Sequence, residues 1–261
     1  MSEPGTGRLA APPAHAPPPP TMPSGLLCPA VLDLSGLRRR TRAPGPGVPR
    51  GPLELYLTRV GAQDERTLRD ARELLDAEER DRARAFRHER DRAAYVVAHA
   101  ALRDVLSVLL GVRAEALPLA REPCAGCGGP HGRPVVRLPG VHFSLSHSGD
   151  LVLVAVAPAP VGVDVEGLAT NRAVLGAQSA LHPAEADELA LLPAHGRPAA
   201  FTRAWVRKEA YLKGLGTGLV RDPARDYVST GPLPAAPAPG WSVRDVLVPA
   251  GYAAAVALRT P

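Results

Sequence analysis

The chain has 261 residues, 45% of them hydrophobic and 22% charged, which is the composition of an ordinary globular protein and excludes a disordered or fibrous one. No run reaches the roughly eighteen uninterrupted apolar residues of a membrane span, so we expect no membrane partner. No basic-then-apolar signal pattern begins the chain, so we do not expect secretion. Three cysteines are too few for a disulfide framework, which indicates a cytoplasmic protein. The net charge of +5 indicates an anionic ligand or partner.

Residues 1–50 are rich in Pro, Ala and Gly and contain four consecutive prolines, Pro17–Pro20. This composition cannot bury a core, so it predicts a disordered, solvated tail that is partly polyproline II in conformation. Order is expected to begin at Leu53, where leucines alternate with more polar residues over 53–58, as in a half-buried strand.

Residues 64–110 are predicted to be helical. A charged helical region over 64–88 precedes a long apolar helix over 91–110, which Gly111 ends. The densest basic patch lies here and consists of Arg80, Arg82, Arg84, Arg87, Arg90 and Arg92. A solvated face paired with neighbouring acids and a phosphate clamp fit this patch equally well. Nucleic-acid binding fits it less well, because aromatic residues that stack on bases are nearly absent here.

The stretch CAGCGGPH places Cys124, Cys127 and His131 within eight residues. This spacing could begin a zinc site, but structural zinc usually has four ligands, and Cys28 lies in the predicted tail. A knuckle-like turn without metal is therefore favoured over a zinc site. Arg133 and Pro134 then predict an extended, exposed turn with a cation at its centre.

Two strands are predicted over 151–156 and 161–165. The preceding stretch, 143–149, is predicted as a loop whose Ser146 and His147 could meet an anion. Asp164 and Glu166 are two residues apart, so a strand places both carboxylates on one face. Such carboxylates repel each other unless a cation separates them, and Mg²⁺ prefers oxygen ligands. An exposed acidic strand end is the alternative.

Residues 201–219 predict a helix with a glycine-rich exit at Gly214, Gly216 and Gly218. Glu209 and Lys213 are four residues apart and share one helix face. A surface ion pair is the simplest interpretation. However, Lys208 and Lys213 are the only lysines among 31 Lys and Arg residues, which favours their use as compact charges for phosphate. Closing strands are predicted over 227–229, 242–248 and 252–258.

The order of predicted elements repeats: strand 53–58 precedes a long helix near Asp91, and strand 161–166 precedes another near Ala200. This order predicts two similar α+β halves with a site at their junction. The expected divisions are a tail over 1–50, an N-terminal half over 51–157 and a C-terminal half over 158–261 that carries the metal and catalytic motifs.

Three motifs occur in order: FSLSHS (143–148), GVDVE (162–166) and WVRKEAYLK (205–213). Their combination resembles the Sfp-type 4'-phosphopantetheinyl transferases over about residues 53–258. The resemblance implies an α+β pseudo-dimer of two similar halves within one monomeric chain. It also implies Mg²⁺-dependent transfer of the phosphopantetheine arm of coenzyme A onto a serine of an acyl or peptidyl carrier protein. A non-catalytic protein of the same fold that binds coenzyme A or a carrier protein is the alternative.

The resemblance also implies roles for individual residues. The metal ligands would be Asp164, Glu166 and Glu209. Glu209 would also be the general base, Lys213 would hold the pyrophosphate, and Lys208 would assist it. The 3'-phosphate and adenosine end would meet Ser146 and His147.

Other correspondences to the family are looser. Arg133 stands where the family commonly has lysine, and Pro134 follows it as usual. Arg82 and His88 match the basic first-helix region less closely. Where the family often has an arginine early in the long helix, this chain has Ala93 and Ala94, so Arg90 and Arg92 become candidates for the 3'-phosphate clamp.

Overall fold

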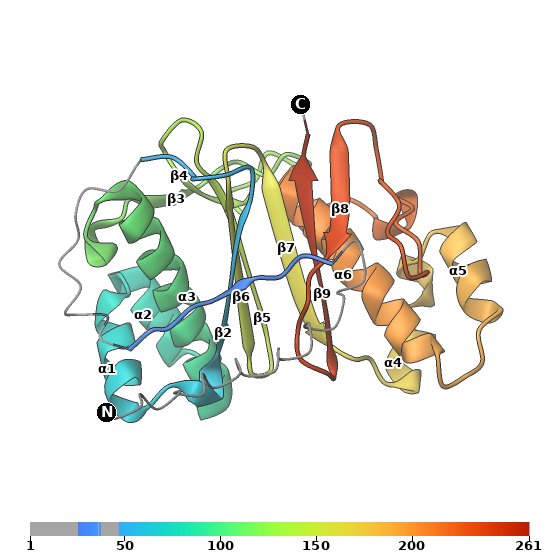
Figure 1. Ribbon diagram of the computed structural model, residues 1–261, viewed down its shortest axis with the longest axis horizontal. Helices are drawn as coiled ribbons and strands as arrows, with labels where there is room; N and C mark the ends of the chain where they lie inside the picture. The colour runs from blue at the N-terminus through green and yellow to red at the C-terminus, as the bar shows by residue number, and fades with distance from the viewer. Residues whose placement is uncertain (1–25, 36, 38–46, 261) are drawn as a thin grey trace, which may run out of the picture.

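The computed structural model describes residues 26–35, 37 and 47–260. The helices and strands of this part are, in chain order, β1 (Ala30–Val31), β2 (Glu54–Arg59), α1 (Glu65–Leu74), α2 (Ala77–Arg84), α3 (Glu89–Leu110), β3 (Leu119–Arg121), β4 (Pro134–Val136), β5 (His142–Ser148), β6 (Leu151–Ala157), β7 (Val161–Gly167), α4 (Asn171–Gly176), α5 (Pro183–Ala190), α6 (Arg197–Leu215), β8 (Trp241–Asp245) and β9 (Tyr252–Arg259). Helices lie on both sides of a central block of strands (Figure 1).

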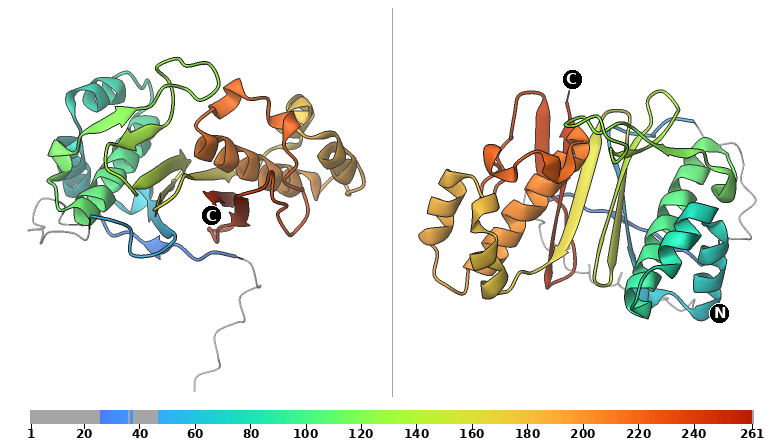
Figure 2. Two further views of the ribbon diagram at one scale, coloured as in Figure 1. Left: turned by 90° about the horizontal axis from the view of Figure 1, so that it is seen from above. Right: turned by 180° about the vertical axis from the view of Figure 1, so that it is seen from behind.

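The central strands form two sheets, in the orders β1-β2-β6-β5 and β7-β9-β8, and β3 and β4 form a separate hairpin. Apart from β1, both sheets have the same arrangement, because the strand that comes last in the chain lies in the middle: β6 lies between β2 and β5, and β9 lies between β7 and β8. The two flanking helical groups, α1–α3 and α4–α6, lie on opposite sides of the sheets in both views (Figure 2). The mixed helices and sheets confirm the predicted α+β class.

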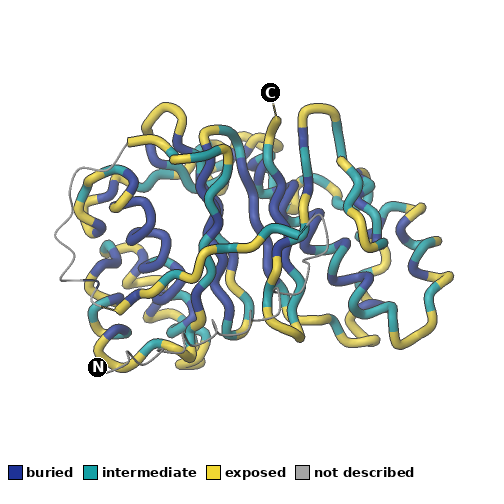
Figure 3. Tube along the Cα trace, in the orientation of Figure 1, coloured by how far each residue is buried: buried dark blue, intermediate teal, exposed yellow. Residues whose placement is uncertain are grey.

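Strand β6 is apolar throughout because both of its faces are covered. Val152, Val154 and Val156 pack in the cluster that contains α3. Leu151 and Leu153, on the other face, pack in a cluster shared with the second sheet. Dark, buried segments accordingly fill the middle of the trace (Figure 3). A strand buried on both faces loses the alternation that marks a half-buried strand.

Helix α3 is long and apolar enough to cross a membrane by length and composition alone. However, 72% of the most apolar 18-residue stretch of this helix is buried inside the protein, against the first sheet and α1. This burial accounts for the apolar composition of the helix. The helix ends at Gly111, whose φ of 66° lies in the left-handed region, as predicted.

Helix α6 lies unusually close to β7 because two glycines face each other. A Cβ on Gly162 would come within 2.0 Å of the carbonyl oxygen of Ala210, and a Cβ on Gly214 would come within 2.7 Å of the Trp241 ring. Gly214 is therefore a packing residue inside the helix, and Gly216, with φ of 78°, is the residue that ends it. This close contact brings the acidic strand and the Glu209–Lys213 face together.

The prediction of a solvated tail over 1–50 is wrong for part of this segment. β1 pairs in parallel with β2, and Leu34 and Leu37 are buried in the core. Leu27 forms a bridge to Val246 beside the second sheet, so residues 27–31 run across both sheets (Figure 1). Leu27, Leu34 and Leu37 make these contacts, whereas the Pro-, Ala- and Gly-rich sequence around them does not indicate a buried segment. Residues 1–25 and 38–46 lie outside the described part.

Three other predictions need correction. The stretch 143–149 is not a loop, because 142–148 form β5 and pair with β6 along their whole length. The helical region over 64–88 is two helices, since Asp76 caps α2 with a capping box to Glu79. Residues 227–229 form no strand, and Ser229 has a φ of 67°. The remaining predicted strands and helices are present, with boundaries shifted by a few residues.

Candidate functional site

The two sheets meet at β5 and β7. Here hydrogen bonds to serine side chains take the place of the backbone-to-backbone hydrogen bonds that would join two paired strands. β5 presents a serine at every second residue on the face toward β7, and each hydroxyl accepts a hydrogen bond from a β7 amide. The three bonds join Val163 N to Ser144 Oγ at 3.0 Å, Val165 N to Ser146 Oγ at 3.3 Å, and Gly167 N to Ser148 Oγ at 3.3 Å. The period of two in the serines matches the period of strand side chains.

Two of these serines also hold the carboxylates of β7. Ser146 Oγ donates to Asp164 Oδ1 at 2.9 Å, and Ser148 Oγ donates to Glu166 Oε2 at 2.8 Å. Both acids therefore lie on the same face of β7, as predicted. Ser144 and Ser148 were not singled out in the sequence, although their alternation with apolar residues in FSLSHS was a usable signal.

Lys213 reaches the same place from α6. Its Nζ lies 2.6 Å from Asp164 Oδ1 and 3.1 Å from Ser146 Oγ. The Asp164 side chain is only 3% exposed, and its Oδ2 is a buried oxygen without a hydrogen-bond partner. Such an oxygen normally costs about 1–3 kcal/mol, more for a charged group, so it marks a place where a further cation would be favourable.

The protonation equilibria of the three acids reflect their burial. Burial raises the pKa of Asp164, and Lys213 partly offsets the shift. Burial also raises the pKa of Glu166, with a smaller contribution from Asp164. Burial and then the charge of Asp164 raise the pKa of Glu209. Ionisation of each acid is therefore less favourable here than in water, and the charge of Asp164 makes the ionisation of Glu166 and Glu209 less favourable still.

The carboxylates of Asp164, Glu166 and Glu209 do not form a compact cluster of ligand atoms in this structure. Among the described residues, the group of three or more His, Cys, Asp or Glu donors that lie within 4.8 Å of one another is Cys124, Cys127 and His131. The three carboxylates are not gathered to that distance, and Lys213 neutralises Asp164 instead. Their coordination of one divalent ion stays a prediction.

The prediction that Lys208 assists in phosphate binding is wrong. Its Nζ is buried, lies 2.7 Å from Glu185 and donates hydrogen bonds to the carbonyl oxygens of Pro223 and Asp226. Helix α6 turns Lys208 away from Lys213, because residues five apart lie on different faces of a helix. Its charge holds the helix against α5 and the loop that follows α6.

Ser146 and His147 have different surroundings because they alternate along β5. The hydroxyl of Ser146 is buried among Asp164, Val165 and Lys213, so it supports the acid instead of facing an anionic ligand, which corrects its predicted role. His147 points to the other face and is exposed. Although its surface is exposed, protein atoms packed around the ring partly desolvate it and lower the pKa of His147, and the charges of His99 and Lys213 lower it further.

Arg133 connects the first half to the end of α6. Its Nη1 donates to the carbonyl oxygen of Gly214 at 3.1 Å, and its Nε lies 2.7 Å from Glu122. Pro134 begins β4, and Arg133 is partly buried, not exposed as predicted. The guanidinium thus lies next to the turn of helix that carries Lys213.

The arginine-rich region is solvent-facing. Arg82 and His88 are both exposed, and His88 precedes the first turn of α3. Arg90 pairs with Asp91 at 3.3 Å, and Arg92 pairs with Glu89. On this surface, neighbouring acids partly neutralise the arginines. Which arginine would clamp the 3'-phosphate stays a prediction.

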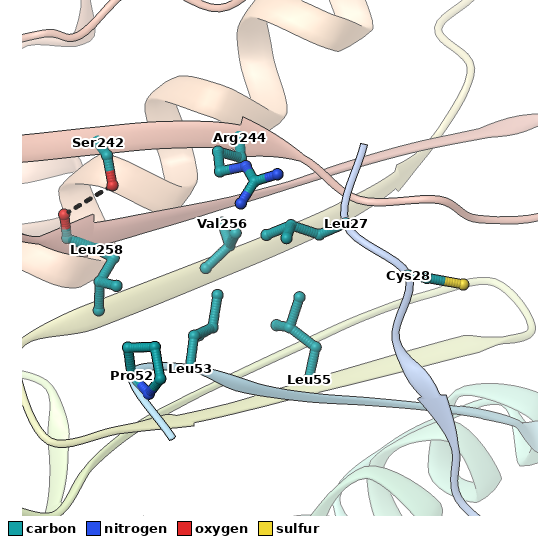
Figure 4. A pocket seen from close by; sticks show the side chains of 9 residues that line it. All are labelled: Leu27, Cys28, Pro52, Leu53, Leu55, Ser242, Arg244, Val256 and Leu258. Atoms are coloured by element: carbon teal, nitrogen blue, oxygen red, sulfur yellow. Dashed lines mark hydrogen bonds between the residues drawn. The ribbon is translucent and has the colours of Figure 1, made fainter. Parts of the chain in front are cut away.

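A cavity of about 300 Å³ lies elsewhere, between the two sheets and next to Leu27 and Cys28 (Figure 4). Leu27, Leu55 and Val256 are among its mostly apolar lining residues, and Arg244 is the charged one. None of the predicted site residues lines it. Asp164, Glu166 and Lys213 lie at the β5–β7–α6 junction and not at this cavity.

Comparisons with known proteins agree with these motifs. Residues 63–159 match the family described as "4'-phosphopantetheinyl transferase, N-terminal", and residues 160–237 match the "4'-phosphopantetheinyl transferase superfamily". The chain is 30% identical to 4'-phosphopantetheinyl transferase HetI of Nostoc over 214 residues, 78% of this chain and 87% of that protein. It is 41% identical to psf-1 of Bacillus pumilus over 34% of this chain and 38% of that protein, and 24% identical to Sfp of Bacillus subtilis over 56% and 62%.

Proposed function

Because the chain belongs to the 4'-phosphopantetheinyl transferase superfamily, we propose that it transfers the phosphopantetheine arm of coenzyme A onto a serine of an acyl or peptidyl carrier protein. The observation that carries this proposal is the convergence of Asp164, Glu209 and Lys213 from β7 and α6 at the junction of the two sheets. The serines of β5 hold this junction together.

We propose further that the fold is a pseudo-dimer, with halves divided near residues 157 and 158. Apart from β1 and the β3–β4 hairpin, the element order of the first half, strand, two short helices, one long helix and two strands, recurs in the second half. A buried ion pair also recurs. Glu79, in the capping box of α2, pairs with Arg103 of α3, and Glu185, in the capping box of α5, pairs with Lys208 of α6. Both halves supplied by one chain favour a monomer, and the composition favours a cytoplasmic one.

The donor set suits a hard divalent cation such as Mg²⁺. Asp164 has an unpartnered buried oxygen, and the raised pKa values of Glu166 and Glu209 indicate carboxylates that a cation would stabilise. Asp164, Glu166 and Glu209 would hold the ion, which would neutralise charge on the pyrophosphate of coenzyme A.

The protein's own groups supply the remaining chemistry. The ammonium group of Lys213 lies beside Asp164 and can contact a pyrophosphate oxygen, which stabilises the negative charge that develops on the leaving group. Glu209 accepts the proton of the attacking carrier serine. The new bond joins the serine oxygen to the phosphorus that bears the phosphopantetheine arm, and the phosphorus–oxygen bond to adenosine 3',5'-bisphosphate breaks.

The decisive experiment incubates the purified chain with coenzyme A, Mg²⁺ and an apo carrier protein. We expect the carrier to gain the mass of one phosphopantetheine arm, with release of adenosine 3',5'-bisphosphate. A carrier of unchanged mass, bound by the chain in the presence of coenzyme A, would instead support the non-catalytic alternative. Carrier incubated without the chain serves as the control.

Magnesium binding should depend on pH because the ion competes with protons. The acids have folded pKa values above their unfolded ones, so their ionisation costs stability, and this cost grows as pH rises through the folded values. Mg²⁺ binds the ionised forms and offsets the cost. We therefore expect Mg²⁺ to raise Tm more at about pH 8 than at about pH 5, measured by calorimetry.

Two variants make this measurement specific. Asp164→Asn should abolish most of the Mg²⁺-dependent rise in Tm, whereas the exposed Asp187→Asn of α5 should keep it. An identical magnesium titration for Asp164→Asn and the unaltered chain would remove Asp164 from the metal site.

A further inference from the structure

The loop between β3 and β4 forms a tight, glycine-rich knuckle. The amide of Cys124 donates to the carbonyl oxygen of Gly129 at 2.7 Å, and the amide of Gly128 donates to the carbonyl oxygen of Cys124 at 2.8 Å. Gly128 has a φ of 74°, which a residue with a side chain would adopt only with strain. The chain thereby reverses direction within a few residues and returns Cys127 toward Cys124.

This reversal gathers three metal-binding atoms. The ligand atoms of Cys124, Cys127 and His131 all lie within 4.8 Å of one another, and Cys127 Sγ lies 3.0 Å from His131 Nε2. In a tetrahedral zinc site, bonds of about 2.3 Å to sulfur and about 2.0–2.1 Å to nitrogen separate two sulfurs by about 3.8 Å and a sulfur from a nitrogen by about 3.6 Å. Shifts of less than about 1 Å would therefore reach this geometry.

The surrounding backbone also leaves room for the donors. A Cβ on Gly129 would lie 3.0 Å from the His131 ring and 3.4 Å from Cys127 Sγ, so glycine at this position permits the imidazole and thiol to meet.

We propose that Cys124, Cys127 and His131 hold one Zn²⁺ ion, with a solvent oxygen as the fourth ligand. Two thiolates and an imidazole are the donors that select zinc over the hard cation expected at the carboxylates. The sequence alone favoured a metal-free turn because it contains no fourth cysteine or histidine nearby. Three protein ligands with water in the fourth position are the arrangement of catalytic zinc sites, so this number of donors is compatible with zinc binding.

The position of this site gives the ion a structural task. The knuckle rests on the exit of α6, where the amide of Ala125 donates to the carbonyl oxygen of Gly216 at 3.4 Å and Cys124 Sγ lies 3.8 Å from the carbonyl oxygen of Thr217. An ion that stiffens the knuckle would therefore stiffen a contact between the two halves, near Lys213. This inference goes beyond the transferase activity, and its test requires no turnover.

The first experiment uses the unaltered chain and measures alkylation of each cysteine by mass spectrometry, with and without zinc. Zinc should slow labelling of Cys127 and Cys124 by about tenfold once its free concentration is about ten times the dissociation constant. Cys28 is exposed, is remote in sequence and serves as the internal control, because its labelling should not change. Equal labelling of Cys127 in both conditions would overturn the proposal.

The second experiment measures the zinc content of the reduced, purified chain after equilibration with zinc and gel filtration. We expect about one zinc per chain, a loss of most of it in Cys127→Ser and His131→Asn, and full retention in Cys28→Ser. Cobalt in place of zinc should give the visible absorption of a tetrahedral thiolate site. Full zinc content in either knuckle variant, or a metal-free unaltered chain, would contradict the proposed site. Circular dichroism confirms that the variants are folded.

Discussion

Glu209→Gln is expected to lose about 10²- to 10⁴-fold in kcat without losing stability. The variant removes the group that accepts the serine proton, and glutamine cannot replace it as a base. At the same time it removes an anion whose pKa is raised by burial and by Asp164, so the folded state is relieved of an unfavourable charge. Turnover is measured by transfer of the arm to a carrier protein, and Tm by calorimetry.

The two readouts for Glu209→Gln separate catalysis from folding. A Tm equal to or above that of the unaltered chain, together with the loss of turnover, shows that the effect is chemical. Glu65→Gln, at an exposed residue in the first turn of α1, is the matched control and should change neither quantity. Wild-type turnover in Glu209→Gln would make this carboxylate a spectator. A lowered Tm would instead assign it a structural role.

Lys208→Met is expected to lower the free energy of unfolding by about 3–5 kcal/mol, because it leaves the buried Glu185 carboxylate without its counter-charge. Glu185 is 0% exposed and Lys208 is 1% exposed, so water cannot take over the lost interaction. Methionine keeps most of the volume of lysine, which limits any contribution from a cavity. Urea unfolding measures the change.

A double-mutant cycle assigns this loss to the pair. In the Glu185→Gln background, Lys208→Met should cost less, with a coupling energy of about 0.5–3 kcal/mol. Arg172→Met, at an exposed residue of α4, is the control and should fall within about 0.5 kcal/mol of the unaltered chain. If Lys208→Met instead left stability unchanged and raised the KM for coenzyme A, Lys208 would be a phosphate ligand after all.

Lys208 illustrates where sequence reasoning stops. Both lysines stood out by their rarity and their place on one helix. Their spacing puts them on different faces of that helix, but the sequence could not show which segments cover each face. Lys213 lies beside Asp164, whereas Lys208 is enclosed by α5 and the loop after α6. Which face of a helix becomes buried depends on segments distant in the chain, because burial is a property of packing.

The strand stretches show a related limit. Alternation and β-branched runs correctly predicted β2, β6 and β7, since those patterns arise from local backbone geometry. FSLSHS was predicted as a loop, and serine is indeed a residue that turns favour. In the fold those serines are strand residues whose hydroxyls bind the amides of β7, so a distant strand overrides the local preference.

By itself, the sequence determined the α+β class, the helix ends at glycine, the shared face of Asp164 and Glu166 and the resemblance to one enzyme family. These features follow from local periodicity and from the chemistry of individual residues, and both can be recognised in the sequence without knowledge of the fold. Only the tertiary structure decided that β7 and α6 pack glycine against glycine, that Lys213 and not Lys208 joins the acids, and that residues 27–31 cross both sheets. Those contacts join residues far apart in the chain, and their energies exist only when the chain is folded.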